Sequence, residues 1–72
     1  MIWIQSPLKR EFIKELLDGN TFEEVQFNFI KQDQMKLYFE HTKEAKLASE
    51  VAKRAVKNSK YGSALFFAVN YE

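Results

Sequence analysis

Cysteine is absent from this 72-residue chain, and His41 is its only histidine. Without cysteine the chain can form no disulfide, thiolate nucleophile or zinc–thiolate site. One histidine also excludes a cluster of imidazole metal ligands. We therefore expect no metal and no other cofactor. A domain this short, without covalent or metal cross-links, has to rely on apolar packing for its stability.

Long apolar runs and a dominant charge are missing as well. The longest apolar stretch, residues 64–69, is far shorter than the about 20 residues that span a bilayer, and the N-terminus lacks a signal-peptide pattern. Eleven basic and ten acidic side chains give a net charge of +1, so no overall field attracts nucleic acid or anionic lipid. We expect a single domain over residues 1–72, located in the cytoplasm and without membrane contact.

Hydrophobic residues make up 46% of the chain and aromatic residues 15%, including seven phenylalanines. Their spacing changes from strand-like to helix-like, then to two strand-like runs, then to helix-like and strand-like again. This succession resembles the ferredoxin-like βαββαβ pattern. We therefore expect an α+β protein, a two-layer sandwich with a four-stranded antiparallel sheet in the order 4-1-3-2 and both helices on one face.

A strand and a helix are predicted at the N-terminus. Residues 2–5 alternate between aliphatic and other side chains, as in a short strand with two different faces. Ser6 and Pro7 suit the N-cap and first position of a helix over residues 7–17, and Gly19 suits the left-handed residue that ends it.

A hairpin and a second helix follow. Alternating apolar residues over 24–29 and 35–40 predict two strands, joined by a polar turn at 31–34. Thr42 suits the N-cap of a helix over 43–57, whose alanine-rich apolar half is expected to pack closely on the sheet.

The last strand, residues 64–71, can adopt two registers, because Phe66 and Phe67 compete for the core. We prefer the register that points Phe67 and the β-branched Val69 inward, which leaves Phe66 on the uncovered face of the sheet. The sequence allows the opposite register as well.

An aromatic row is predicted on that uncovered face. In the order 4-1-3-2 the first and third strands are central, so alternation brings Trp3, Tyr38 and Phe66 next to one another. Polar residues, among them Asn70, flank the row. The predicted binding face consists of Trp3, Gln26, Asn28, Lys36, Tyr38 and Phe66.

Three uses of this row are open. It can stabilise the sheet by cross-strand pairing, bind a second copy or another protein, or stack the bases of single-stranded nucleic acid. With Trp3 and Tyr38 on the two central strands, the layout resembles the RNA-recognition motif. That resemblance is topological, because residues 35–40 lack the family's glycine-and-aromatic signature. Glu24 and Glu40 also outnumber Lys36 on a face that should be basic to bind phosphates.

Two charged clusters are further candidates. Ser6, Lys9 and Arg10, at the start of the first helix, could hold a phosphate or carboxylate through free backbone N–H groups. The solvent side of the second helix carries a possible basic patch, which we expect mainly to solvate the helix. This patch consists of Lys43, Lys46, Lys53, Arg54 and Lys57.

Catalytic machinery is not indicated. Glu23, Glu24 and Glu40 could approach one another only on an open sheet, which supplies no cleft for acid–base catalysis. His41 is expected to be a loop residue that assists a helix cap, and the polar residues 59–61 are neighbours in a loop. The sequence thus predicts a non-enzymatic binding module, a homodimer or a binder of a protein partner. The alternative is a single-strand nucleic-acid binder that uses the same aromatics with the lysine-rich helix.

Overall fold

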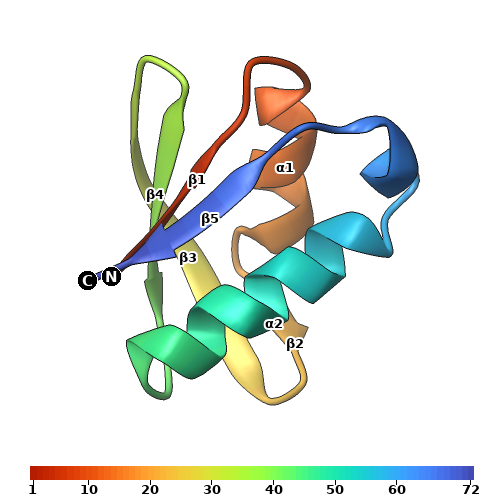
Figure 1. Cartoon of the computed structure of the whole chain (residues 1–72). Helices are drawn as coiled ribbons and strands as arrows, with labels where there is room; N and C mark the ends of the chain where they lie inside the picture. The colour runs from red at the N-terminus through yellow and green to blue at the C-terminus, as the bar shows by residue number, and fades with distance from the viewer.

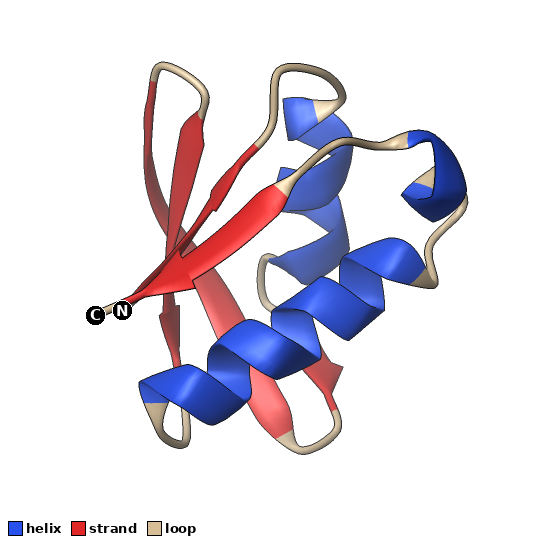
Figure 2. Ribbon diagram, in the orientation of Figure 1, coloured by secondary structure: helices blue, strands red, loops and turns tan.

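One antiparallel sheet and two helices make up the fold in the computed structural model, which describes all residues from Met1 to Glu72 (Figure 1). The sheet is curled, and both helices cover the same face of it (Figure 2). The elements are β1 (Ile2–Gln5), α1 (Arg10–Leu17), β2 (Thr21–Phe22), β3 (Val25–Asp33), β4 (Lys36–His41), α2 (Ala45–Lys57), a 3-10 turn (Gly62–Ala64) and β5 (Ala68–Tyr71).

The sheet has five strands in the order β2-β3-β4-β1-β5, all paired antiparallel. The prediction of a four-stranded, ferredoxin-like sheet in the order 4-1-3-2 is therefore wrong, although the fold is α+β as expected. The added strand forms because a turn at Glu23–Glu24 folds Thr21–Phe22 back onto Val25–Gln26. Both turn residues have positive φ, 49° and 69°, as in type I′ hairpin turns. Such turns usually carry Asn-Gly, so two glutamates gave no turn signal in the sequence.

Alternation along the strands divides the side chains between two faces. Ile2 and Ile4 are 0% exposed beneath the helices, whereas Trp3 between them lies on the uncovered face and is half-buried. Tyr38 is half-buried in the same way on β4. The core contains Ile2, Ile4, Ile13, Leu17, Val25, Phe27, Leu37, Phe39, Ala48, Val51, Ala52 and Val56.

Both helices begin later than the sequence predicts. Ser6 is buried, and its hydroxyl donates to a carbonyl two residues along the chain and caps no helix N–H. α1 therefore starts only at Arg10, after Lys9 in a left-handed conformation with φ 60°. Thr42 lies before α2 and does not cap it, because its Oγ1 accepts a hydrogen bond from the N–H of Gln26 across the hairpin, at 3.0 Å.

The hairpin of β3 and β4 is longer than predicted. β3 continues to Asp33, so the turn consists of Gln34 and Met35 and not of residues 31–34. Residues 31–33 of β3 are exposed, although Leu37, the partner of Gln32 on β4, is 0% exposed in the core. Because residues 31–33 are polar on both faces of β3, their sequence resembles that of a turn.

A β-bulge interrupts this hairpin at Ile30. Phe29 pairs with Phe39 before the bulge, and Lys31 pairs with Tyr38 after it. The extra residue reverses the alternation of β3, so Lys31 joins the uncovered face instead of the covered one.

The last strand is shorter than the predicted residues 64–71. A 3-10 turn packs Gly62 against the end of α2, where a Cβ atom would overlap the carbonyl of Lys57, and pairing with β1 begins only at β5. Phe67 packs against the core, as in the register we preferred, whereas Phe66 is 86% exposed.

Candidate binding face

A row of side chains crosses the uncovered face at one level of the sheet. Trp3 of β1 lies opposite Tyr38 of β4 on one side and Asn70 of β5 on the other. The ring centroids of Trp3 and Tyr38 are 5.8 Å apart and their planes are tilted by 35°. Beyond Tyr38, the Nζ of Lys31 lies 5.0 Å from the ring centroid, within cation–π range. From here on, the name aromatic row means these four residues in line: the two aromatic side chains Trp3 and Tyr38, with Asn70 at one end and Lys31 at the other.

Charged groups of opposite sign flank the aromatic row along β4. Lys36 precedes Tyr38 by two residues and Glu40 follows it by two, so both project from the uncovered face. Lys36 aligns with Gln5 on one neighbouring strand and with Asp33 on the other. The row therefore has Lys36 and Asp33 on one side and Glu40 on the other.

The uncovered face as a whole is electrically balanced. It carries two lysines, Lys31 and Lys36, and two acids, Asp33 and Glu40. The only ion pair in the chain joins α2 to the β2–β3 turn, so none of these four groups belongs to one. A balanced face offers no net attraction for a phosphate backbone, but its charges are free to pair with complementary groups.

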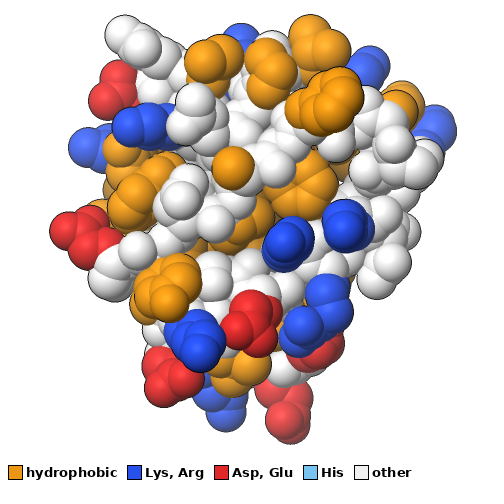
Figure 3. Space-filling model, viewed as in Figure 1, with side chains coloured by type: hydrophobic (Ala, Val, Ile, Leu, Met, Phe, Trp, Pro, Cys, Tyr) orange, Lys and Arg blue, Asp and Glu red, His pale blue; other side chains and the backbone are white.

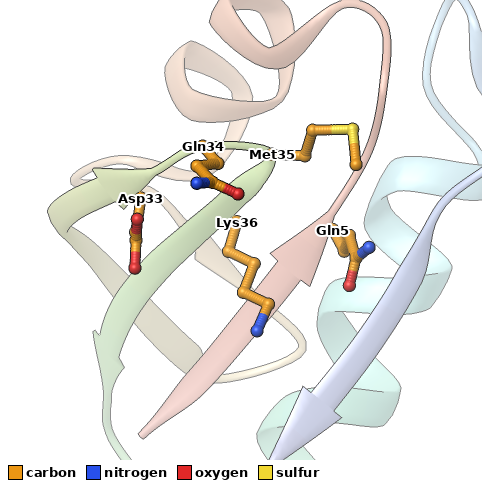
Figure 4. A pocket seen from close by; sticks show the side chains of 5 residues that line it. All are labelled: Gln5, Asp33, Gln34, Met35 and Lys36. Atoms are coloured by element: carbon orange, nitrogen blue, oxygen red, sulfur yellow. The ribbon is translucent and has the colours of Figure 1, made fainter.

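A shallow hollow of about 150 Å³ opens at the turn end of this face (Figure 4). Its side chains come from the end of β1 and from the β3–β4 turn, and Figure 4 shows them standing apart around open space. Ligand pockets usually exceed about 300 Å³, so this depression is too small to enclose a cofactor. The hollow is lined by Gln5, Asp33, Gln34, Met35 and Lys36.

The structure brings together most of the residues predicted for the binding face. Asn28 lies opposite Glu40 on β3, and Gln26 lies two residues away, beside β2; both are exposed. Phe66 is not next to Trp3. It comes before β5, four residues and roughly 13 Å of extended chain from Asn70, which occupies that place instead.

Sequence reasoning missed two members of the face. Lys31 and Asp33 were assigned to the turn, but they lie on β3 opposite Tyr38 and Lys36. No local signal could have placed them, because the bulge that reverses their alternation depends on pairing with β4. Glu24, which we expected on this face, lies in the β2–β3 turn instead.

Buried Ser6 connects three segments at one end of the sheet. Its N–H donates to the carbonyl of Met35 at 3.0 Å, and its hydroxyl lies 2.7 Å from the carbonyl of Leu8 and 3.4 Å from that of Phe66. The side chains of Met35, Leu8 and Phe66 are 41%, 67% and 86% exposed, respectively. Figure 3 shows hydrophobic side chains gathered along the upper margin of the molecule, where these segments meet in Figure 1.

The residues of the proposed anion site turn toward separate partners. Arg10 donates from Nη1 to the carbonyls of Ser6 and Pro7, at 3.0 and 2.8 Å. The Nζ of Lys9 lies 4.7 Å from the ring centroid of Tyr61, and Ser6 is buried. These side chains are thus engaged with the protein and do not converge on one point.

The basic patch is divided by an ion pair. Arg54 binds Glu23 through two hydrogen bonds of 2.8 Å, which lower the pKa of Glu23 and raise that of Arg54 from their ordinary values. Lys43 precedes α2 in a left-handed conformation with φ 63°. The remaining members, Lys46, Lys53 and Lys57, are exposed on α2.

Two of the groups considered for catalysis, His41 and Ser59, have structural partners. His41 Nδ1 lies 3.0 Å from the carbonyl of Thr42, and its Nε2 is buried without a partner. The hydroxyl of Ser59 donates to the carbonyl of Val56. The chain contains no group of three or more His, Cys, Asp or Glu residues arranged to hold a metal ion.

Comparisons with protein-family models, curated proteins and solved structures find no match for this chain. Neither helix is both long and apolar enough to cross a membrane. We therefore infer the function of the protein from the geometry and charge of its uncovered face.

Proposed function

We propose that the protein is a non-enzymatic interaction module that self-associates by packing its uncovered sheet face against the same face of a second copy. We place this activity in the cytoplasm. The observation that carries the proposal is the aromatic row with Lys36 on one side and Glu40 on the other. An aromatic centre with a polar and charged rim is the usual composition of a protein interface.

A simple symmetry makes this face complementary to itself. A two-fold axis between two stacked sheets, directed along the aromatic row, places Trp3, Tyr38 and also Lys31 against their own counterparts, so the aromatic contact is accompanied by one like-charge contact. The same axis exchanges the two sides of the row. Lys36 of each copy then lies opposite Glu40 of the other copy, so the dimer gains two ion pairs of opposite charges.

The size of the face predicts how tightly the copies bind. The molecule measures 27 × 24 × 19 Å along its principal axes. A face bounded by the two longer extents covers roughly 650 Å², against about 800 Å² per partner in standard interfaces. We therefore expect a reversible dimer whose population rises with protein concentration.

The first test removes the aromatic row. Sedimentation velocity and light scattering should detect self-association of the wild-type protein, and Trp3→Ala with Tyr38→Ala should remove the face contact and so lower the average mass of the assembly. Lys53→Ala, on the helix side, serves as the control and should leave the dimer intact. A wild-type chain that stays monomeric at every practical concentration contradicts self-association.

The second test reverses the charges. Lys36→Glu and Glu40→Lys should each weaken the face contact and lower the average mass of the assembly, because each places like charges opposite one another. The double variant has the composition of the wild type and should restore the face contact and the wild-type mass. A double variant as weak as the single ones would show that these residues do not face each other across the interface.

Single-strand nucleic-acid binding is the second candidate. The 5.8 Å spacing of Trp3 and Tyr38 on adjacent strands, with Lys31 beside them, favours it. The balanced charge of the face argues against it, and so does the position of α2, the helix that carries the lysines, which lies on the other side of the sheet (Figure 1). Titration with short oligonucleotides at low salt should leave the Trp3 fluorescence unchanged; quenching that salt reverses would favour nucleic acid instead.

A further inference from the structure

From Phe27 to Phe29, the outer edge of β3 is protected against further strand pairing. Phe27 donates its N–H to the carbonyl of Asn20 at 3.0 Å, and its carbonyl accepts from the N–H of Gly19 at 2.7 Å. The N–H of Phe29 donates to Oδ1 of Asp18 at 2.9 Å. The segment between α1 and β3 thus occupies the hydrogen-bonding groups that another strand would need.

The opposite edge of the sheet, formed by β5, is open. Glu72 donates its N–H to the carbonyl of Met1 at 3.2 Å, so the antiparallel alternation directs the backbone groups of Asn70 toward β1. The N–H and C=O groups of Val69 and Tyr71 then point away from the sheet. No hydrogen bond from a loop, cap or side chain reaches them.

Nothing in the sequence of this edge prevents pairing. Natural edge strands usually carry a lysine, a proline or a bulge that blocks another strand, whereas residues 61–71 contain no charge and no proline. Tyr71 is 49% exposed. In Figure 3 the strip that β5 follows shows backbone and hydrophobic atoms, while charged side chains gather over α2 and at the left margin.

We infer that β5 pairs antiparallel with β5 of a second copy, so that one continuous sheet runs through both molecules. Strand β5 can pair with β5 of a second copy because it carries no charged side chain, so the pairing places no like charges opposite one another. In a register centred on Val69, Phe67 lies across from Tyr71 of the other copy on the covered side. Ala68 lies across from Asn70 on the uncovered side. This pairing satisfies the free backbone groups and covers part of the exposed Tyr71 ring.

This edge contact is independent of the proposed face contact. It uses backbone groups of β5 and a two-fold axis perpendicular to the sheet, whereas the face contact uses side chains and an axis parallel to the sheet. Two such contacts on one chain can close at four copies. Blocking either contact should therefore leave dimers held by the other.

The test compares two variants in a background where Lys36→Glu blocks the face. Tyr71→Pro removes an outward N–H without touching the bonds of β5 to β1, and proline is tolerated on edge strands. Tyr71→Thr removes the ring but keeps the N–H. Sedimentation should find dimers for Lys36→Glu alone and with Tyr71→Thr, but monomers with Tyr71→Pro.

The outcomes separate the two proposals. A Lys36→Glu variant that is monomeric at every concentration overturns the edge pairing, as does a dimer that survives Tyr71→Pro. In the wild-type background, a monomeric Tyr71→Pro variant would instead overturn the face contact while the edge pairing stands.

Amide hydrogen exchange on the wild-type protein tests the same contact without any variant. The amides of Val69 and Tyr71 should exchange about tenfold more slowly as the protein concentration rises into the range where dimers form. The amide of Gln32, which points outward from the far end of β3, is the control and should not change. Concentration-independent exchange at Val69 and Tyr71 would overturn the proposal.

Discussion

The two faces of the sheet differ although they are built from the same strands. Ile4 and Phe39 are 0% exposed on the covered face, and Trp3 and Tyr38, their immediate neighbours, are half-buried on the other. The covered face supports the entire core, whereas the uncovered face carries one aromatic row among balanced charges. One residue along a strand thus separates the side chains that hold the fold from those available for binding.

The aromatic contacts of the two faces show the same difference. On the covered side the rings of Phe29 and Phe39 meet edge to face with centroids 5.7 Å apart, in contact with the rest of the core. The Trp3–Tyr38 pair has a similar spacing of 5.8 Å but has only Lys31 and solvent above it. The first pair is therefore already packed against the core, although Phe29 is only half-buried, whereas the second pair can still gain by excluding water from its exposed side.

The largest expected difference is in the free energy of unfolding, between substitutions of two neighbouring residues on β4. Phe39→Ala leaves a cavity in the core and should lower the free energy of unfolding by about 3–5 kcal/mol, enough to unfold much of a domain this small. Tyr38→Ala should cost less than about 1 kcal/mol, because it removes only a cross-strand contact. Urea denaturation followed by circular dichroism measures both. Equal losses would show that the uncovered face also supports the fold.

Two milder substitutions on β1 test the same difference between the covered and uncovered faces. Ile4→Val removes one buried methylene and should cost about 0.5–1.5 kcal/mol of unfolding free energy. Gln5→Val, on the uncovered face, should change it by less than about 0.5 kcal/mol, because valine suits a strand and no buried group is lost. Denaturation midpoints should fall for the first variant and stay nearly constant for the second.

The hairpin turn beside the covered face offers a stabilising change. Glu24 has a φ of 69°, a left-handed conformation that side chains disfavour and glycine adopts freely. Glu24→Gly should therefore raise the free energy of unfolding by about 0.5–1 kcal/mol, after the greater entropy of unfolded glycine is counted. A fall in thermal stability would show that the Glu24 side chain contributes more than its strained backbone costs.

The smallest effect concerns the exposed ion pair of Arg54 with Glu23, on the helix side. Hydrogen bonds from Arg54 lower the pKa of Glu23 below its ordinary value of 4.5. A lowered folded-state pKa stabilises the fold above the ordinary value, and this stabilisation is lost as the pH falls through the folded-state value. Between about pH 6 and pH 2, the melting temperature of the wild type should fall slightly more than that of Glu23→Gln. Equal falls of the melting temperature in the wild type and in Glu23→Gln would mean that the ion pair contributes nothing to stability.

Alternation and helical spacing predicted the contrast between the faces correctly. Trp3 and Tyr38 meet on the uncovered face because each lies between residues that the core requires. The ends of elements were less predictable. Ser6 and Thr42 have the chemistry of helix caps, but the Ser6 hydroxyl donates to the carbonyls of Leu8 and Phe66, and the Thr42 hydroxyl accepts from Gln26 across the hairpin. Both helices therefore begin later.

The sequence alone determined which residues alternate, which helical faces are apolar, and hence that a two-helix layer covers one side of an antiparallel sheet. These features depend on the local geometry of the chain, which repeats every few residues. Only the tertiary structure decided the added strand β2, the bulge at Ile30, the position of Phe66 and which edge of the sheet stays open. Strand β2 depends on a tight turn whose two glutamates are atypical of such turns. The other features depend on backbone contacts between distant segments, which leave no periodic trace in the sequence.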